Sequence, residues 1–269
     1  MVQNAAKKIA EIAVPQPEEI AIRNHKFHVV TLLFHDSEKR WNPKAGQDRK
    51  ETGLWLLPLG LSATVYVATL LDGYDTWQSV IEPDLWRYQQ ELKFEFVPIP
   101  NPRRAQECLA YTTYIIENYH KLPNHVVFLH GYPVDHNPYL LEQLQTLLDK
   151  DLPVPDFLHL NSESVLLRCQ RYTRNTTIIR HLGLQANATE TCYQPKYCCS
   201  QFVVAKEAIL KRSLHFYRML RKLTMDNQDC SQMEHLWHVV FGHAASFDGL
   251  SIKDLLHPQM LKMITLNTE

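Results

Sequence analysis

The stretch from residue 101 to residue 138 reads NPRRAQECLAYTTYIIENYHKLPNHVVFLHGYPVDHNP and decides the fold class. Apolar residues recur at helical spacing in its first half, and Pro123 ends that helix. The run from His125 to Leu129 is β-branched and aromatic, which is typical of a buried strand in a parallel sheet. A polar loop follows at once. In open α/β sheets ligands bind beyond the carboxyl ends of the strands, so we expect the functional site near Asp135 and His136.

The rest of the chain repeats this alternation of strands and helices. Strands are predicted at 27–34, 64–71, 94–99 and 202–205, and helices at 138–149, 206–223 and 231–241. Such a pattern predicts an α/β fold: a single Rossmann-like domain over residues 25–269, with a mostly parallel central sheet flanked by helices. Residues 1–24 are expected to add an N-terminal helix and linker. A chain of 269 residues with 45% apolar content is large enough to bury one such core.

Composition indicates the cellular compartment of the protein and the state of its cysteines. No apolar run approaches the ~20 residues that cross a bilayer, and charged residues interrupt the N-terminal apolar stretch, so we expect a cytoplasmic protein with no membrane partner. The six cysteines are Cys108, Cys169, Cys192, Cys198, Cys199 and Cys230. Without a secretion signal we expect them to be thiols. Their spacing matches no zinc site. No metal is therefore expected.

The chain also lacks the usual nucleotide-binding motifs. Its 8 glycines form neither a G-x-G-x-x-G pattern nor a P-loop, so no cofactor is predicted. Asp135 followed by His136 is a weak version of the acidic pair with which A-type sugar-nucleotide glycosyltransferases hold a metal. The alternative is an Asp that caps the next turn. Both interpretations stay open from the residues alone.

Two further pairs are candidates for chemistry. Cys199 or Ser200, at the start of the strand at 202–205, could accept an acyl group, or the cysteine could pack as a small hydrophobe. Glu234 and His238 are spaced one helical turn apart and could act as general acid and base, or form an ordinary surface hydrogen bond.

The predicted helix from 206 to 223 is strongly basic. Its cations are Lys206, Lys211, Arg212, Arg218, Arg221 and Lys222, against a single carboxylate, Glu207. Such a surface suits a phosphate backbone. A solvated helix is the alternative interpretation.

Three motifs together resemble a known family. The first is Glu107-Cys108-x-x-Tyr111 with the strand and polar loop after it, the second is Tyr197-Cys198-Cys199-Ser200-Gln201-Phe202, and the third is Glu234-x-x-Trp237-His238-x-x-Phe241-Gly242. They resemble, in order and over about residues 62–243, a large and mainly fungal family catalogued as a domain of unknown function. Some members of that family are arginine-containing cyclodipeptide synthases.

The resemblance implies an aminoacyltransferase that makes an arginine-containing diketopiperazine from aminoacyl-tRNAs. Its substrates are already activated esters, so no ATP site is needed. The implied catalytic residues are Glu107, Asp135, His136, Cys199, Ser200, Glu234 and His238. The implied substrate-binding residues are Asp75, Trp77, Tyr111, Cys198, Gln201 and Trp237, with the six cations for tRNA. A carboxylate should hold the guanidinium group of the arginyl substrate. A glycosyltransferase and a non-catalytic RNA- or protein-binding module remain the alternatives.

Overall fold

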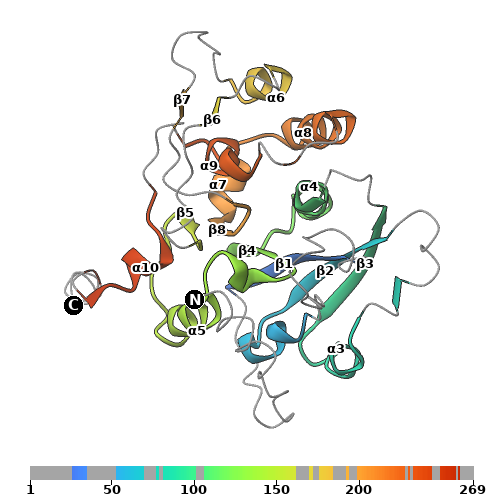
Figure 1. Cartoon of the computed structure of the whole chain (residues 1–269), viewed down its shortest axis with the longest axis vertical. Helices are drawn as coiled ribbons and strands as arrows, with labels where there is room; N and C mark the ends of the chain where they lie inside the picture. The colour runs from blue at the N-terminus through green and yellow to red at the C-terminus, as the bar shows by residue number, and fades with distance from the viewer. Residues whose placement is uncertain are drawn as a thin grey trace, which may run out of the picture.

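The computed structural model describes residues 26–34, 53–69, 77–78, 81–100, 106–161, 170–171, 176–183, 192–193, 199–227, 230, 233–243, 249–258 and 260. Their centre is a six-stranded sheet in the order β3-β2-β1-β4-β8-β5 (Figure 1). Its strands are β1 (Phe27–Phe34), β2 (Ala63–Thr69), β3 (Phe94–Pro100), β4 (His125–His130), β5 (Phe157–His159) and β8 (Phe202–Ala205). The prediction of an α/β fold with a mostly parallel sheet is confirmed.

The sheet is mixed because of one strand. β1 pairs in parallel with both β2 and β4, and β2 pairs in parallel with β3. β8 pairs antiparallel with β4 and with β5, so β5 runs in the same direction as β4. The carboxyl ends of β1 to β5 therefore meet at one edge of the sheet, called the carboxyl edge below, where β8 begins. The opposite edge is called the amino edge. The short strands β6 (Gln170–Arg171) and β7 (Cys192–Tyr193) form a separate pair.

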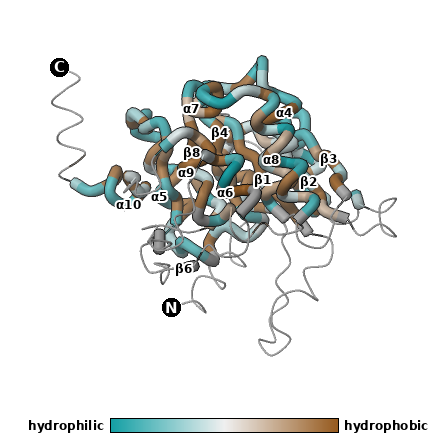
Figure 2. The backbone as a smooth tube through the Cα atoms, turned by 90° about the horizontal axis from the view of Figure 1, so that it is seen from above, coloured by the Kyte–Doolittle hydropathy of each residue, from teal (hydrophilic) through white to brown (hydrophobic). Residues whose placement is uncertain are grey.

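Helices cover both faces of the sheet (Figures 1 and 2). The α-helices are α3 (Pro83–Arg87), α4 (Gln106–Asn118), α5 (Leu140–Asp149), α6 (Thr176–His181), α7 (Lys206–Leu210), α8 (Leu214–Asn227), α9 (Trp237–Val240) and α10 (Ile252–Leu255). The 3-10 helices are η2 (Leu54–Leu59), η4 (Pro133–Asp135) and η6 (Met233–His235).

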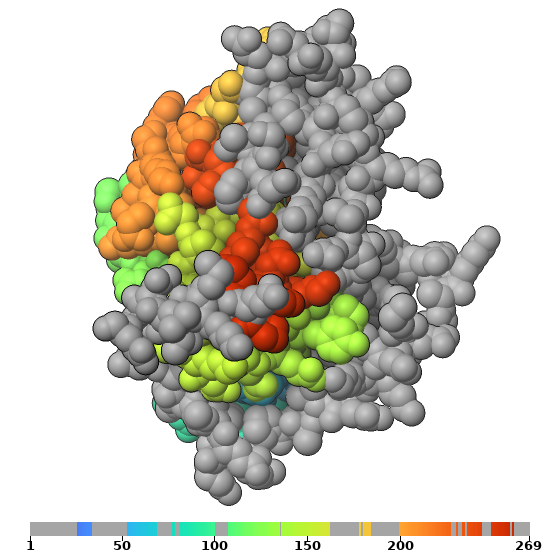
Figure 3. Space-filling model, turned by 90° about the vertical axis from the view of Figure 1, so that its left-hand side faces the viewer, coloured from blue at the N-terminus to red at the C-terminus, as the bar shows by residue number. Residues whose placement is uncertain are grey.

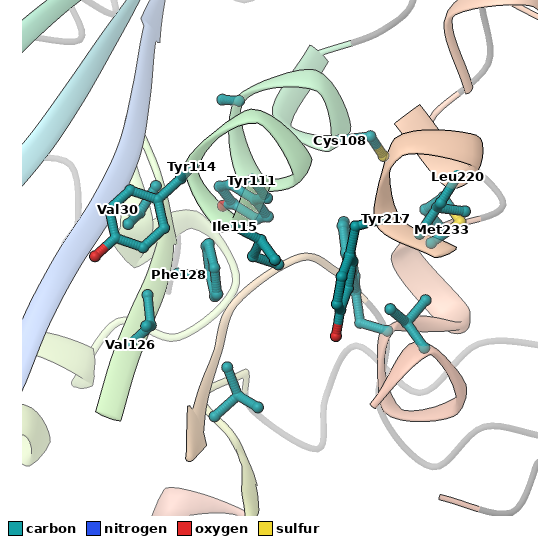
Figure 4. Close-up of a cluster of buried hydrophobic side chains, with 14 of the residues drawn as sticks. Val30, Cys108, Tyr111, Tyr114, Ile115, Val126, Phe128, Tyr217, Leu220 and Met233 are labelled. Carbon is teal, nitrogen blue, oxygen red and sulfur yellow. The ribbon is translucent and has the colours of Figure 1, made fainter. Parts of the chain in front are cut away.

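Alternate residues of each strand divide the core into two clusters. On one face Val30 and Phe128 pack with Tyr111, Ile115 and Tyr217, under α4 and α8 (Figure 4). The other face packs against η2, α3, α5 and α10. Figure 3 shows α10 in red next to the yellow-green α5 on that side. Both faces of the sheet are apolar because a buried parallel strand packs against a layer of helices on each face.

Two predicted helices are interrupted. The basic helix expected at 206–223 consists of α7 and α8, because the Ser213 hydroxyl accepts the backbone N–H of Phe216 and caps a new helix at Leu214. The helix expected at 231–241 is the turn η6 followed by α9, which begins at Trp237. In the described part of the chain, no helix combines the length and the apolar character needed to cross a bilayer.

Candidate active site

The carboxyl edge contains the point at which the strand order reverses. β2 and β3 lie on one side of β1, and β4 lies on the other, so the crevice of such a sheet opens between the ends of β1 and β4. His130, the last residue of β4, pairs in register with Leu32 of β1. The ring of His136 lies edge-on to that of His130, with 5.1 Å between the ring centroids. The functional site that the sequence predicts next to His136 therefore lies at the point where the strand order reverses.

Gln201 connects the loops at this edge. Its side-chain oxygen accepts the backbone N–H of His130 (3.3 Å), and its Nε2 donates to the carbonyl of Pro133 and to Oδ1 of Asn161, both at 2.9 Å. Gln201 is fully buried. Every polar atom of its amide is therefore used inside the protein, which makes Gln201 a structural clip between β4, β5 and β8, whereas the sequence predicted a substrate contact.

Two buried asparagines extend this clip, and sequence reasoning missed both. Asn161 donates to the carbonyl of Cys199 (3.2 Å), and Asn137 donates to the carbonyl of Leu160 (2.8 Å). Each asparagine comes within two residues of a predicted or observed strand end or turn. That position was the only signal in the sequence, because the residue type alone does not tell whether an asparagine side chain is buried or lies exposed in a loop.

Ser200 lies where the three sequence motifs meet. Its Oγ accepts the indole N–H of Trp237 (3.0 Å), and its carbonyl accepts the hydroxyl of Tyr111 (2.9 Å). The rings of Tyr111 and Trp237 are 5.7 Å apart, and all three residues are buried. Among the described residues Trp237 makes the only hydrogen bond to Oγ, so the hydroxyl proton of Ser200 is not donated to another protein group there.

The predicted acids and bases of the three motifs are buried to different depths. Glu107 is half-buried one turn before Tyr111 on α4. Burial, with a smaller contribution from the Glu107 carboxylate, raises the pKa of Tyr111. His238 is buried in α9, and its ring centroid lies 6.4 Å from that of His159. Glu234 is half-buried in η6, so it and His238 do not share one continuous helix as predicted.

Burial keeps two histidines of this edge neutral near pH 7. It lowers the pKa of His130 to about 4. It lowers the pKa of His159 to about 3, with further contributions from His238 and His243. A neutral imidazole can donate or accept a hydrogen bond but is a weak proton acceptor at these pKa values.

The expectation of free thiols is wrong for the described cysteines. Cys108 and Cys230 form a disulfide across 122 residues of sequence, and Cys199 is disulfide-bonded as well. Cys199 is buried with a positive φ of 74°, a strained conformation next to Ser200. A disulfide sulfur has no thiolate to attack an ester, so Cys199 cannot be the acyl acceptor in this state, and Ser200 is the remaining candidate.

The six predicted tRNA-binding cations do not form one surface. Lys211 pairs with Asp156 (2.9 Å) and Lys222 with Asp226 (2.6 Å), a second acid beyond Glu207. Arg212 donates to the carbonyls of Val239 and Val240 at the end of α9. Arg212 therefore caps the end of α9.

The position of α8 divides the remaining cations. Lys206 starts α7 at the amino edge, where its N–H donates to the carbonyl of Asn124. α8 starts near Tyr119 at the same edge, and the disulfide at Cys108 ties the chain after α8 to the carboxyl-edge end of α4. Arg218 and Arg221 thus lie in the middle of α8, further from the amino edge than Lys206. Neither forms an ion pair with the described residues.

Four further predicted positions are not placed at this edge by the described residues. Asp75 and Cys198 lie outside the described residues, and the side chain of Asp135, at the end of η4, is not described either. Trp77 packs against Trp86 at 6.1 Å in the apolar cluster of the other face. Among the described residues no three His, Cys, Asp or Glu side chains are placed to hold a metal ion.

A family model covers this edge. DUF3431, described as a protein of unknown function, matches residues 85–249. The chain belongs to this family. The DUF3431 match contains α4, β4, η4, β5, β8 and α9, whereas Leu32, Asp75 and Trp77 lie outside it. A comparison with curated proteins finds no match.

Proposed function

We propose that the protein is a tRNA-dependent cyclodipeptide synthase that joins an arginyl group and a second aminoacyl group into a diketopiperazine. The observation that carries the proposal is the convergence of the three motifs on Ser200, through its contacts with Tyr111 and Trp237. Tyr111 and Trp237 are 126 positions apart in the sequence, and both contact the one residue Ser200.

In this proposal Ser200 accepts the first aminoacyl group from its tRNA ester. The Ser200 Oγ–acyl bond forms as the bond to the tRNA ribose oxygen breaks, and the hydroxyl proton goes to that leaving oxygen. The amine of the second aminoacyl-tRNA then attacks the new ester: the peptide bond forms as the Ser200 Oγ–acyl bond breaks, and Oγ takes back a proton from that amine. The free amine of the first aminoacyl group next attacks the ester of the second, and this ring closure releases the second tRNA, whose ribose oxygen takes the amine proton. The indole N–H of Trp237 fixes the orientation of Oγ, which is the positioning that acyl transfer requires.

Glu107 is the described carboxylate that best fits the arginyl side chain. It is half-buried at the carboxyl edge, one turn from Tyr111, so a guanidinium group beside it would be partly shielded from water. Shielding strengthens a bidentate contact between a carboxylate and a guanidinium group.

The experiment is expression in a host with ordinary charged tRNAs, followed by mass spectrometry of the medium. We expect an arginine-containing diketopiperazine from the natural chain and at least a ~100-fold loss with Ser200→Ala, because the acyl acceptor is removed. Ser213→Ala is the matched control: it removes the cap of α8, far from Ser200, and should retain the product. An absent product from the natural chain would refute the function, and full activity of folded Ser200→Ala would refute the role of Ser200.

A glycosyltransferase is a second candidate because of the disulfides. Disulfides such as Cys108–Cys230 persist in oxidising compartments and are rare in the cytosol, where aminoacyl-tRNAs are found. A sugar-nucleotide glycosyltransferase does not use aminoacyl-tRNAs, so a disulfide does not conflict with its function. Mass spectrometry of Cys108 and Cys230, alkylated in intact cells of the source organism, separates the two candidates. Thiols favour the synthase and a cytoplasmic location, whereas a stable disulfide favours the glycosyltransferase.

A further inference from the structure

A pocket of about 240 Å³ opens at the amino edge of the sheet, beneath the second half of α4. It lies at the opposite end of the strands from Ser200. Its base is a row of second residues from three neighbouring parallel strands, His28 of β1, Thr64 of β2 and Glu95 of β3. Tyr114 and Asn118 of α4 and Lys121 after it also line the pocket.

The base of the pocket is rigid and polar. The two ring nitrogens of His28 lie 2.8 Å from Oγ of Ser62 and 2.9 Å from Oγ1 of Thr64. The ring of Tyr114 stacks on His28 at 5.3 Å, with an angle of 12° between the planes. These contacts fix the imidazole and leave oxygen lone pairs of both hydroxyls for a ligand.

Tyr114 brings an unused hydroxyl to the pocket. Its side chain is only 3% exposed, yet its phenol makes no hydrogen bond to the described residues. Figure 4 shows that hydroxyl on the side of the ring turned away from Ile115 and Tyr217. Burial and the nearby charge of Glu95 raise the pKa of Tyr114, so the phenol stays a neutral donor. The hydroxyl is not among the buried polar atoms that lack a partner, so it is accessible from the pocket, where a ligand oxygen can accept its proton.

Two opposite charges flank the opening. The side chains of Glu95 and Lys121 are exposed, and neither forms an ion pair with the described residues. A lone anion would meet the carboxylate of Glu95, and a lone cation would meet the ammonium of Lys121. A molecule that carries both charges satisfies both groups.

We propose that this pocket binds a small zwitterion of the α-amino acid class. Its ammonium group pairs with Glu95, its carboxylate with Lys121, and the Tyr114 hydroxyl donates to a ligand oxygen. The volume equals that of about eight waters at roughly 30 Å³ each, which admits an amino acid with a short side chain. This inference is independent of the proposed function, because no residue of the carboxyl edge takes part.

The test is ligand-detected NMR of the full chain with the common amino acids, followed by calorimetry with the best binder. We expect a Kd below about 1 mM, a value within reach of a ligand of this size. The corresponding amine without the carboxylate, and the corresponding acid without the ammonium, should each bind at least about tenfold more weakly. Glu95→Gln and Lys121→Met should weaken binding by a similar factor, and Tyr114→Phe by about threefold.

Glu91→Gln and Lys150→Met are the matched controls, since both side chains are exposed and outside the pocket. They should leave the affinity unchanged. The proposal is overturned if none of the amino acids binds, if the acid alone binds as tightly as the zwitterion, or if the pocket variants bind like the controls.

Discussion

At the carboxyl edge of the sheet, Gln201, Asn161 and Asn137 use their hydrogen-bonding groups on one another and on the backbone, and all three are buried. At the amino edge, Glu95 and Lys121 face solvent without an ion-pair partner among the described residues. The same sheet thus ends in a closed polar network on one side and in open charges on the other.

The difference separates stability from ligand recognition. A satisfied buried network holds loops in one geometry, and removing one member leaves the others unpaired. Exposed charges contribute little to folding but remain available to a ligand. We therefore expect substitutions at the carboxyl edge to change the free energy of unfolding strongly, and substitutions at the amino edge to change it little.

The largest effect should come from the disulfide at the carboxyl edge. The double variant Cys108→Ala/Cys230→Ala removes a cross-link that closes a loop of 122 residues. We expect the free energy of unfolding to fall by about 4 kcal/mol, because the unfolded chain regains the entropy of that loop. Urea unfolding measures this change, and dithiothreitol should lower the midpoint of the natural chain more than that of the variant, which keeps the disulfide of Cys199. Equal midpoints for the natural chain with and without dithiothreitol would show that the cross-link does not stabilise this edge.

Gln201→Leu should have the next largest effect. It keeps the side-chain size but leaves the His130 N–H, the Pro133 carbonyl and Oδ1 of Asn161 without their bonds. We expect a loss of about 3 kcal/mol, measured by urea unfolding.

Gln145→Leu is the matched control for Gln201→Leu. Gln145 is half-buried, and its Nε2 donates to the carbonyl of Pro58 at 3.1 Å. We expect that substitution to cost about 1 kcal/mol or less. Similar losses for the two variants would contradict the view that the Gln201 network is special.

The contrast between the edges also explains what the sequence could predict. The apolar runs of β1 and β8 predicted their bounds, since a buried strand leaves a local pattern. The antiparallel direction of β8 left no such pattern, because direction depends on the whole chain path. The disulfide between Cys108 and Cys230 joins residues far apart in sequence, and their pairing is invisible without the fold.

The candidate site shows the same limit. Ser200 and Trp237 were predicted from separate motifs, and their hydrogen bond brings them together. Gln201 was predicted from the same motif as Ser200, but its amide faces the protein. A motif reports which residues matter at an edge, whereas the packing decides whether a side chain holds a loop or faces a substrate.

The third largest effect should come from acid, which should destabilise the carboxyl edge. Burial lowers the pKa of His130 to about 4 and, as the largest cause, that of His159 to about 3, both below the ordinary value of 6.5. The unfolded chain therefore binds more protons between these values, so the stabilisation is complete above pH 6.5 and is lost as the pH falls. Each histidine should cost about 1 kcal/mol per pH unit below 6. Unfolding measured between pH 7 and pH 5, roughly the range before carboxylates titrate, tests this sign. His159→Phe should flatten the slope.

The smallest effect is expected on tRNA affinity, from substitutions of the basic side chains of α7 and α8. Arg218 and Arg221 lie in the middle of α8 and make no ion pair with the described residues, whereas Lys206 and Lys211 lie closer to the amino edge. If a tRNA approaches Ser200, Arg218→Gln/Arg221→Gln should lower tRNA affinity several-fold. The log–log salt dependence should also fall, by somewhat under one unit for every phosphate group that is no longer neutralised.

The matched pair Lys206→Gln/Lys211→Gln removes the same charge from the other edge. It should leave both the affinity and the salt dependence of tRNA binding nearly unchanged. Because the two pairs change net charge equally, a general electrostatic attraction would weaken binding to the same extent in both. Equal losses of affinity would therefore show that the tRNA has no preference for either edge. A larger loss from the lysine pair would show that the tRNA binds at the amino edge, away from Ser200.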